Sequence, residues 1–226
     1  MRYTSTIMKR IIEVTEDGSH TLFLPEMNEH FHSVHGAIQE STHVFIENGL
    51  RKCSRQTVHI LEIGFGSGLN AFLTFLNRGD QEIHYYTLEK YPLTDPEFTA
   101  LNYAEQLRVE QHPIFRQLHE CEWEHKVEIA PGFFLQKINA DLTTIDFKNL
   151  PKFDLIYFDA FAPNKQPEMW TDAIFSKISG HCNSGAIFTT YCAKGDVRRS
   201  LQKNGYLMQR IPGPPGKKEM LFGEKA

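Results

Sequence analysis

The stretch Leu61–Asn70, LEIGFGSGLN, decides the fold of this chain. An apolar run before it predicts a strand over 58–63, and the apolar residues after it predict a helix from about 69 to 76. Between them, Gly64, Gly66 and Gly68 alternate with larger residues. Glycines at a strand-to-helix turn tolerate positive φ and let a ligand approach the backbone closely. The stretch therefore predicts a nucleotide-binding turn in an α/β fold.

The segments on either side continue the alternation of strand and helix. The pattern predicts helices over 95–107 and 196–204, and strands over 83–88, 133–138, 153–158, 186–190, 206–211 and 219–222. Such alternation is typical of an α/β protein with a mostly parallel sheet covered by helices on both faces. The sequence shows no internal repeat and no linker to a second large domain.

The first fifty residues have a different pattern. They predict a hairpin of strands 10–14 and 21–24 around Glu16–Ser19, and then a helix from 37 to about 49. We therefore expect residues 1–50 to form an extension that packs over the ligand site. Residues 51–226 are expected to form a single compact domain.

Composition excludes several classes of protein. No apolar window of this 226-residue chain is long enough to span a bilayer, and its start lacks a signal-peptide pattern. The four cysteines are scattered without CxxC spacing, which favours a reduced, cytoplasmic chain. The net charge is -4, but from Lys194 onward eight Lys or Arg stand against three Asp or Glu. This basic segment is a candidate surface for a polyanion, although an ordinary solvated surface explains it equally well.

Four acidic residues stand where predicted strands end: Glu62, Glu89, Asp141 and Asp159. Parallel sheets bind ligands outside the carboxyl ends of their strands, so these residues predict one site. Glu89 lies about 20 residues beyond the glycines, where a carboxylate accepts both hydroxyls of a ribose. Asp141 is placed to accept a hydrogen bond from an adenine amino group.

NAD and S-adenosylmethionine both contain a ribose, and Glu62 distinguishes between them. The turn is GxGxG rather than GxGxxG, and no Lys-Ser/Thr follows it, which argues against NAD and against a phosphate-binding P-loop. An acidic residue beside the glycines would repel a pyrophosphate but suits the cationic end of S-adenosylmethionine. Glu62 therefore favours S-adenosylmethionine as the cofactor.

Six ordered motifs extend this interpretation over most of the chain. They are HSVHGAIQESTHVF (32–45), LEIGFGSGLNA (61–71), TLEKYPL (87–93), DAFAPNKQPEMW (159–170), TTYCAKGDVRRSL (189–201) and PGPPGKKEM (212–220). Together they resemble the MnmC/MnmD-type methyltransferase family. The resemblance implies a class I S-adenosylmethionine-dependent fold, Rossmann-like, whose final strand is antiparallel. It also implies methylation of the exocyclic amine of 5-aminomethyl-(2-thio)uridine at the wobble position of tRNA.

The resemblance carries further expectations about partners. The anticodon loop of tRNA would be the substrate, and a functional link to the enzymes that install the aminomethyl group is expected. Many relatives carry a second, flavin-dependent oxidoreductase domain, and no motif of this chain corresponds to it. We therefore expect a methyltransferase acting without that domain, with no FAD chemistry.

The acceptor amine decides which residues do the chemistry. A primary alkylamine is mostly protonated at neutral pH, so a neighbouring carboxylate must orient it and accept its proton. Asp159, which follows an apolar strand and opens a stiff loop containing Pro163 and Pro167, is the candidate catalytic residue. Its alternative role is to cap the following turn. In the family motif HGAxxES, Glu40 is expected to meet the amino group of the cofactor.

Recognition of a wobble base calls for aromatic rings and cations. Phe161, Trp170 and Tyr191 are candidates for stacking on the base, with Phe161 also beside the cofactor; packing beneath the loop is the alternative for each. Lys194, Arg198 and Lys217 are candidates for phosphate contact. His30, His32 and His35 lack Cys or acidic partners at ligand spacing, so no metal is expected.

Two other functions remain open on the residues alone. An aminopropyltransferase acting on polyamines would also place acids at the sheet edge, without a basic C-terminal face. A non-catalytic nucleotide-binding subunit would keep the glycines and lack turnover.

Overall fold

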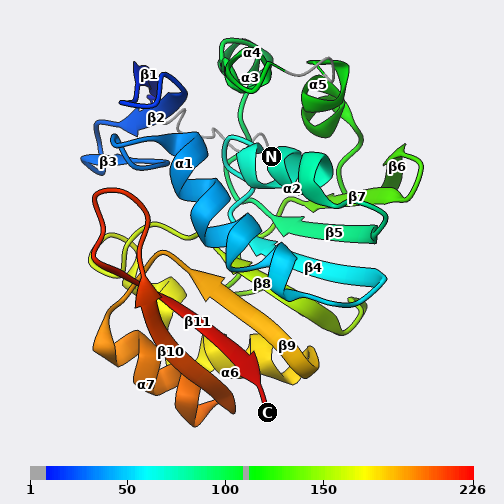
Figure 1. The fold of residues 1–226 in the computed structure, drawn as a ribbon, viewed down its shortest axis with the longest axis vertical. Coiled ribbons are helices and arrows are strands. Elements are labelled where there is room, and N and C mark those ends of the chain that lie inside the picture. Colours follow the sequence, from blue (N-terminus) through cyan, green and yellow to red (C-terminus); the bar gives the residue numbers. More distant parts are fainter. Residues whose placement is uncertain (1–8, 109–111) are drawn as a thin grey trace, which may run out of the picture.

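The computed structural model describes residues 9–108 and 112–226, which form two sheets (Figure 1). The large sheet has eight strands in the order β10-β11-β9-β8-β4-β5-β7-β6. Its strands are β4 (Thr57–Ile63), β5 (Glu82–Leu88), β6 (Lys126–Ala130), β7 (Phe133–Ile138), β8 (Phe153–Phe158), β9 (Cys182–Thr190), β10 (Tyr206–Pro212) and β11 (Glu219–Lys225).

Pairing within this sheet is mostly parallel. β4 pairs in parallel with β5 and β8, β5 pairs with β7, and β8 pairs with β9. β11 lies antiparallel between β9 and β10, and β6 lies antiparallel on β7. The predicted α/β class, the parallel sheet and the antiparallel final strand are therefore confirmed.

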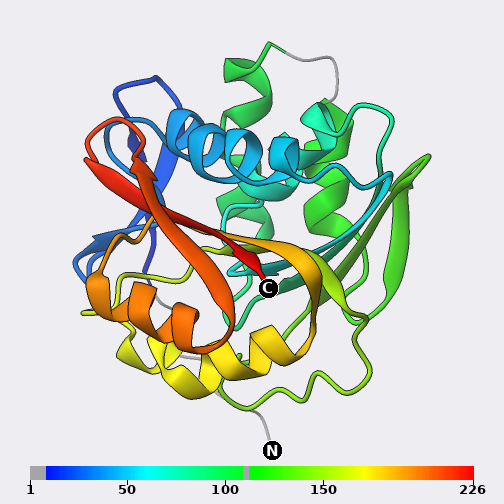
Figure 2. The same cartoon turned by 60° about the horizontal axis from the view of Figure 1, so that its bottom comes forward.

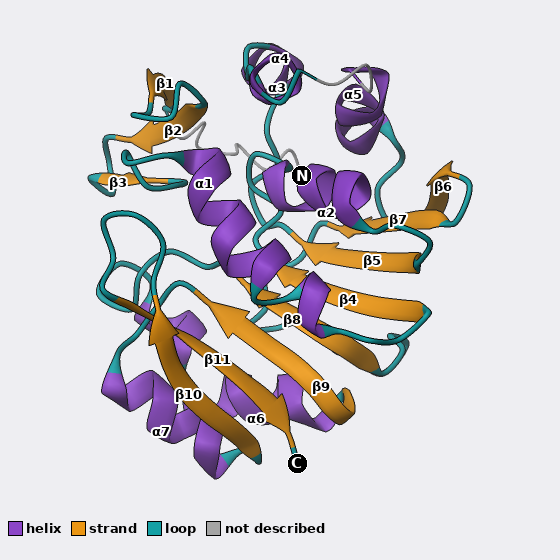
Figure 3. Cartoon of the chain, in the orientation of Figure 1, coloured by secondary structure: helices purple, strands orange, loops and turns teal. Residues whose placement is uncertain are grey.

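Helices cover both faces of the large sheet (Figures 2 and 3). α1 (Ala37–Ser41), its π-helical continuation η1 (Thr42–Glu47) and α2 (Leu69–Asn77) lie on one face, and α6 (Asp172–Gly180) and α7 (Gly195–Lys203) lie on the other. α3 (Asp95–Thr99), α4 (Tyr103–Gln106), α5 (His112–Glu120) and the 3-10 turns η2 (Leu50–Lys52) and η3 (Pro167–Trp170) complete the described helices. No helix in these described residues is long and apolar enough to cross a membrane.

The helix predicted over 95–107 is two helices. α3 starts with a capping box between Thr94 and Glu97, and the chain breaks before α4 at Asn102. The Asn102 side chain accepts the N–H of His20 (2.8 Å) and donates to the carbonyl of Gly18 (3.0 Å). This tertiary pairing ties the break between the two helices to the N-terminal hairpin. Two helices, α5 and α6, and the strand β6 were not predicted from the sequence.

The N-terminal hairpin is joined to the main core through α1 and η1. β1 (Ile11–Val14), β2 (His20–Leu24) and β3 (Glu29–His30) form the small antiparallel sheet. Asp17, in the predicted turn, accepts the N–H of Gln39 (3.0 Å) at the start of α1. Phe45 of η1 is 1% exposed and packs against Tyr157 of β8, with ring centroids 5.0 Å apart. Although the hairpin is a separate sheet, η1 therefore packs one face into the main core.

Glu62, expected to face a ligand, is instead fully buried in β4. Its Oε2 accepts a hydrogen bond from Thr87 (2.8 Å), and Asn70 and Tyr85 lie within reach. Burial raises the pKa of Glu62 well above its usual range, more than these hydrogen bonds lower it. Glu62 is enclosed and does not line the cavity, and its raised pKa disfavours the anion, so the electrostatic argument based on Glu62 is wrong.

Phe45→Ala tests whether the N-terminal segment belongs to the core. Removing a buried ring leaves a cavity, so we expect a loss of about 3–5 kcal/mol in the free energy of unfolding, measured by urea denaturation. Leu207→Ala, at a side chain 68% exposed, is the control and should change stability by less than about 0.5 kcal/mol. Equal, small effects would show that η1 is dispensable for the core.

Glu62→Gln tests the charge state of the buried carboxyl. Because its pKa is raised in the folded state, wild-type stability from this group is full at low pH and is lost as pH rises above about 4.5. Urea titrations should therefore show the variant gaining stability relative to wild type between about pH 5 and pH 8. Glu224→Gln, at an exposed position near the end of β11, is the control. A stability difference for Glu62→Gln that is independent of pH would contradict the assignment.

Candidate active site

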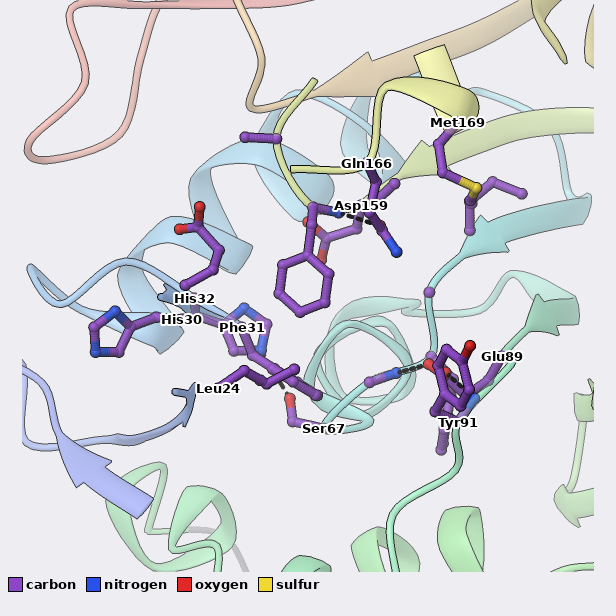
Figure 4. Close-up of a pocket in the computed structure, with 18 of the residues that line it drawn as sticks. Leu24, His30, Phe31, His32, Ser67, Glu89, Tyr91, Asp159, Gln166 and Met169 are labelled. Atoms are coloured by element: carbon purple, nitrogen blue, oxygen red, sulfur yellow. Dashed lines mark hydrogen bonds between the residues drawn. The ribbon is translucent and has the colours of Figure 1, made fainter. Parts of the chain in front are cut away.

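One cavity of about 510 Å³ lies at the carboxyl ends of β4, β5, β7 and β8. Because these strands are parallel, the residues that follow them meet at one edge of the sheet. Asp159 and Glu89 enter the cavity from different strand ends, and Phe31 and His32 enter it from the N-terminal segment (Figure 4). Of the residues singled out in the sequence, those that line it are Glu40, Gly64, Gly66, Glu89, Asp141, Asp159, Phe161, Tyr191 and Lys217.

The glycine turn forms the floor of the cavity. Gly64 has φ +90°, and a Cβ there would lie 3.0 Å from the carbonyl oxygen of Asp159. A side chain would therefore separate the two neighbouring strand ends. Gly68 does not line the cavity, contrary to expectation; a Cβ there would lie 2.7 Å from Nε2 of His119. Gly68 thus serves the packing of α2 on α5, a helix that the sequence pattern did not predict.

Glu89 connects two turns at the cavity edge. Its Oε2 accepts the N–H of Gly66 (2.9 Å), and its Oε1 accepts the N–H of Tyr91 (2.7 Å). A carboxylate has about four lone-pair positions, so each oxygen can still accept a ligand hydroxyl. Glu89 is therefore oriented by backbone donors and remains available to a diol.

Asp141 is held as an anion. Burial alone would raise its pKa, but hydrogen bonds from Thr143 and from Lys90 (2.9 Å) outweigh burial and lower the pKa to about 2. The N–H and hydroxyl of Thr143 donate at 2.8 and 2.6 Å. Asp141 is therefore an acceptor at every physiological pH.

Asp159 differs from Asp141 in its proton affinity. Burial raises the pKa of Asp159 to about 7, against the opposing hydrogen bond from Asn70 (2.8 Å). The charge of Glu40 raises this pKa further, while that of Lys217 lowers it. A carboxyl group with this pKa can accept and release a proton near neutral pH, as a general base requires.

Glu40 and Lys217 form an ion pair inside the cavity. The other oxygen of Glu40 accepts the N–H of Ser33 (2.7 Å). The Lys217 ammonium also lies 3.9 Å from the centroid of the Tyr191 ring, and the Tyr191 hydroxyl donates to the carbonyl of Ala160 (2.8 Å). Lys217, expected at a phosphate, therefore points into the cavity toward the residue expected to bind the cofactor amino group.

Trp170 supports the cavity wall from behind. It is 8% exposed, packs on Phe158 with centroids 4.8 Å apart, and does not line the cavity. Its Nε1–H donates to the carbonyl of Phe161 (2.8 Å), so it holds the residue that does line the cavity. The prediction that Trp170 contacts substrate is wrong because the ring is covered by the packing of the loop.

Lys194 and Arg198 also lie outside the cavity lining. Lys194 precedes α7 and is exposed, and Arg198 lies within α7. They belong to the basic C-terminal segment, and they are not placed to contact a ligand inside the cavity.

Several lining residues were not predicted from the sequence. His32 Nε2 pairs with the hydroxyl of Ser67 (2.7 Å) in the glycine turn, and burial lowers the pKa of His32 to about 4, which keeps it neutral. The ring of Phe31 meets that of Phe161 edge-on, with centroids 5.5 Å apart. Gln166 accepts the N–H of Phe161 (3.2 Å). These residues could have been suspected from the sequence only because they are polar or aromatic and lie in or beside the motifs that start at residues 32 and 159.

His30, His32 and His35 have different partners and do not form one cluster. His30 pairs with Glu13 (2.9 Å) and His35 with Glu16 (3.1 Å), while His32 turns to the glycine turn. Over residues 9–108 and 112–226, no group of three His, Cys, Asp or Glu side chains is arranged to hold a metal ion.

Comparisons with known proteins agree with this geometry. Residues 102–226 match a family described as S-adenosyl-L-methionine-dependent methyltransferase. The structure of MnmC2 from Aquifex aeolicus has the same fold, with a TM-score of 0.75 and 24% identity over 98% of this chain and 72% of that one.

Curated relatives cover most of the chain. Proteins of Marinomonas sp. and Cupriavidus metallidurans, each named tRNA 5-methylaminomethyl-2-thiouridine biosynthesis bifunctional protein MnmC, are 30% and 31% identical over 83% and 94% of this chain. The same name is carried by a Burkholderia thailandensis protein, 30% identical over 99% of this chain. The chain spans about a third of the length of these relatives, covering 30%, 34% and 36% of them. It belongs to the MnmC-type family of S-adenosyl-L-methionine-dependent methyltransferases.

Proposed function

We propose that this enzyme methylates the exocyclic amine of 5-aminomethyl-(2-thio)uridine at the wobble position of tRNA. The observation that carries the proposal is the meeting of the glycine turn, Glu89, Asp141 and Asp159 in one cavity of about 510 Å³. This volume is within the usual range for cofactor and substrate sites. The names of the MnmC relatives supply the substrate class.

The chain offers each part of the cofactor a suitable partner. Glu89 would accept the two ribose hydroxyls, and Asp141 would accept the adenine amino group. Gly64 and Gly66 allow close approach to the backbone, and residues 1–50, through His32 and Glu40, would cover the cofactor. When bound, S-adenosylmethionine supplies an electrophilic methyl group, so the protein has chiefly to align the acceptor and exclude water.

Asp159 would handle the proton of the acceptor amine. Its negative charge favours the ammonium form, so it cannot lower the amine pKa; it acts by orienting the amine and accepting its proton. With a pKa of about 7, the group returns the proton to solvent readily near neutral pH. Phe161, braced by Trp170 and Phe31, would provide the flat wall against the base.

The basic C-terminal segment would meet the anticodon stem-loop. Lys194 and Arg198 lie on or beside α7, outside the cavity, where phosphate contact leaves the cofactor site undisturbed. Tyr191 lines the cavity and links this segment to the acceptor wall through Ala160. Such contacts would make tRNA affinity fall steeply with salt.

Asp159→Asn tests the proton-acceptor role. Single-turnover methylation of hypomodified tRNA, with labelled S-adenosylmethionine and tRNA in excess, should slow by about 100-fold or more. The wild-type rate should rise with pH through about 7, because protonated Asp159 accepts no proton, and the variant should lose that step. Asp80→Asn, at an exposed position in the turn before β5, is the control. A near-wild-type rate for Asp159→Asn would refute the role.

The same assay separates the alternatives when the acceptor is varied. Transfer to tRNA that disappears when the wobble uridine is replaced supports the proposal. Transfer to polyamines would indicate a small-amine transferase, and binding without any transfer would indicate a non-catalytic subunit.

A further inference from the structure

The loop after β8 turns back on itself and places one neutral polar side chain in the wall of the cavity. The backbone N–H groups of Lys165 and Gln166 donate to the carbonyl of Ala162 (2.7 and 3.0 Å), which closes a tight turn. The Gln166 side chain then folds back, and its Oε1 accepts the N–H of Phe161 (3.2 Å). Phe161 follows closely after Asp159, so this bond brings the Gln166 amide to the end of the cavity where Asp159 lies (Figure 4).

The bond to Phe161 fixes which end of the amide faces the cavity. A backbone N–H can only donate, so the atom that receives it must be the oxygen of Gln166. The NH2 group is then the end left for the cavity, which Gln166 lines. Among residues 9–108 and 112–226, this nitrogen donates to no other group. Gln166 therefore offers a neutral hydrogen-bond donor to a ligand.

The loop holds this donor in a fixed position. Nζ of Lys165 donates to the carbonyls of Met27 (2.7 Å) and Asn28 (3.2 Å), which ties the loop to the turn between β2 and β3. Pro167 restricts the backbone of Gln166, the residue before it. A group that is already held in place loses little conformational entropy when a ligand binds, so its hydrogen bond contributes more to affinity and selectivity.

Each lysine that lines the cavity is already paired with a carboxylate. Lys90 lies 2.9 Å from Asp141, and Lys217 pairs with Glu40. These ion pairs leave the lysine ammonium groups engaged. A ligand oxygen that needs a donor at the Asp159 end of the cavity would therefore meet the NH2 group of Gln166.

We propose that the Gln166 amide donates a hydrogen bond to O4 of the wobble uracil. This recognition rests on the proposed function, which brings the 5-aminomethyl group of the base to Asp159. Because C4 and C5 are adjacent ring atoms, the amine and O4 lie on the same edge of the base, as Asp159 and Gln166 lie on the same loop. Bases taken out of their stack are recognised by such edge hydrogen bonds and by stacking, here on Phe161.

The fixed orientation of the amide has a consequence for specificity. Uracil has an acceptor at position 4, whereas cytosine has an amino donor there. An amide that could rotate freely would serve either base, but turning Gln166 would set its NH2 group against the N–H of Phe161. Two donors facing each other in a part-buried site leave a hydrogen bond unmade, which is costly. Gln166 therefore selects uracil over cytosine.

Anticodon stem-loop RNAs with 5-aminomethyluridine or 5-aminomethylcytidine at the wobble position test this selection. Wild-type kcat/KM for methyl transfer should favour the uridine RNA by about 10–100-fold. Gln166→Glu keeps an oxygen for the N–H of Phe161 but removes the donor, so the preference should disappear or reverse. Gln166→Met has neither group and should lose the preference without reversing it. Gln117→Glu, at an exposed position on α5, is the control and should keep the wild-type preference.

Binding of S-adenosylhomocysteine separates recognition of the base from recognition of the cofactor. Its affinity, measured by isothermal titration calorimetry, should be the same in both Gln166 variants as in wild type, and melting temperatures monitor folding. An affinity that falls as much as kcat/KM would show that Gln166 serves the cofactor and would overturn the inference.

Two further outcomes bear on the base itself. Equal transfer to both RNAs by the wild-type protein, or an unchanged uridine preference in Gln166→Glu, would show that the amide does not recognise O4. Either result would leave the proposed function in place, because the uridine RNA is still methylated. Transfer to neither RNA by the wild-type protein would refute the proposed function and the recognition of O4 together.

Discussion

Parallel pairing of β4 with β5 and β8 is the constraint on which the site depends. Ile63 pairs with Leu88 on one side and with Phe158 on the other, so the next residues of the three strands lie at one level. Backbone hydrogen bonds continue this register past the strand ends: Gly64 donates to Leu88 (2.9 Å), and Asp159 donates to Ile63 (3.1 Å). A slip of one residue would turn the acids to the other face. Sheet register therefore fixes the acids relative to the glycine turn.

Different surroundings then give the acids of this region different charge states. Thr143 and Lys90 keep Asp141 ionised, with a pKa of about 2, whereas burial brings the pKa of Asp159 to about 7. Glu62, fully buried beneath the turn, has a raised pKa and belongs to the core. Asn70 donates to Asp159 and lies within reach of Glu62, so the core and the cavity share one polar connection. Asp141 therefore stays ionised across physiological pH, whereas Asp159, the proposed proton acceptor, titrates near neutral pH.

Local sequence patterns predicted the features that depend on neighbouring residues along the chain. Every strand of the large sheet except β6, the glycine turn, and the rim positions of Glu89, Asp141 and Asp159 followed from apolar runs and their ends. Glu62 was misplaced because it lies within β4, where neighbouring strands and α2 enclose it. Trp170 was misplaced because nothing local shows that the loop covers its ring. Glu40 and Lys217 are 177 residues apart, so their pairing has no signal in the sequence.

The central claim is that this cavity uses S-adenosylmethionine to methylate a wobble aminomethyl group. Its most direct test is mass spectrometry of nucleosides from tRNA of the source organism with this gene deleted, before and after incubation with the purified protein and S-adenosylmethionine. The account predicts that the 5-aminomethyl nucleoside, thiolated or not, accumulates in the deletion strain and gains one methyl group on incubation. Unchanged nucleosides, or methylation at any other position, would contradict it.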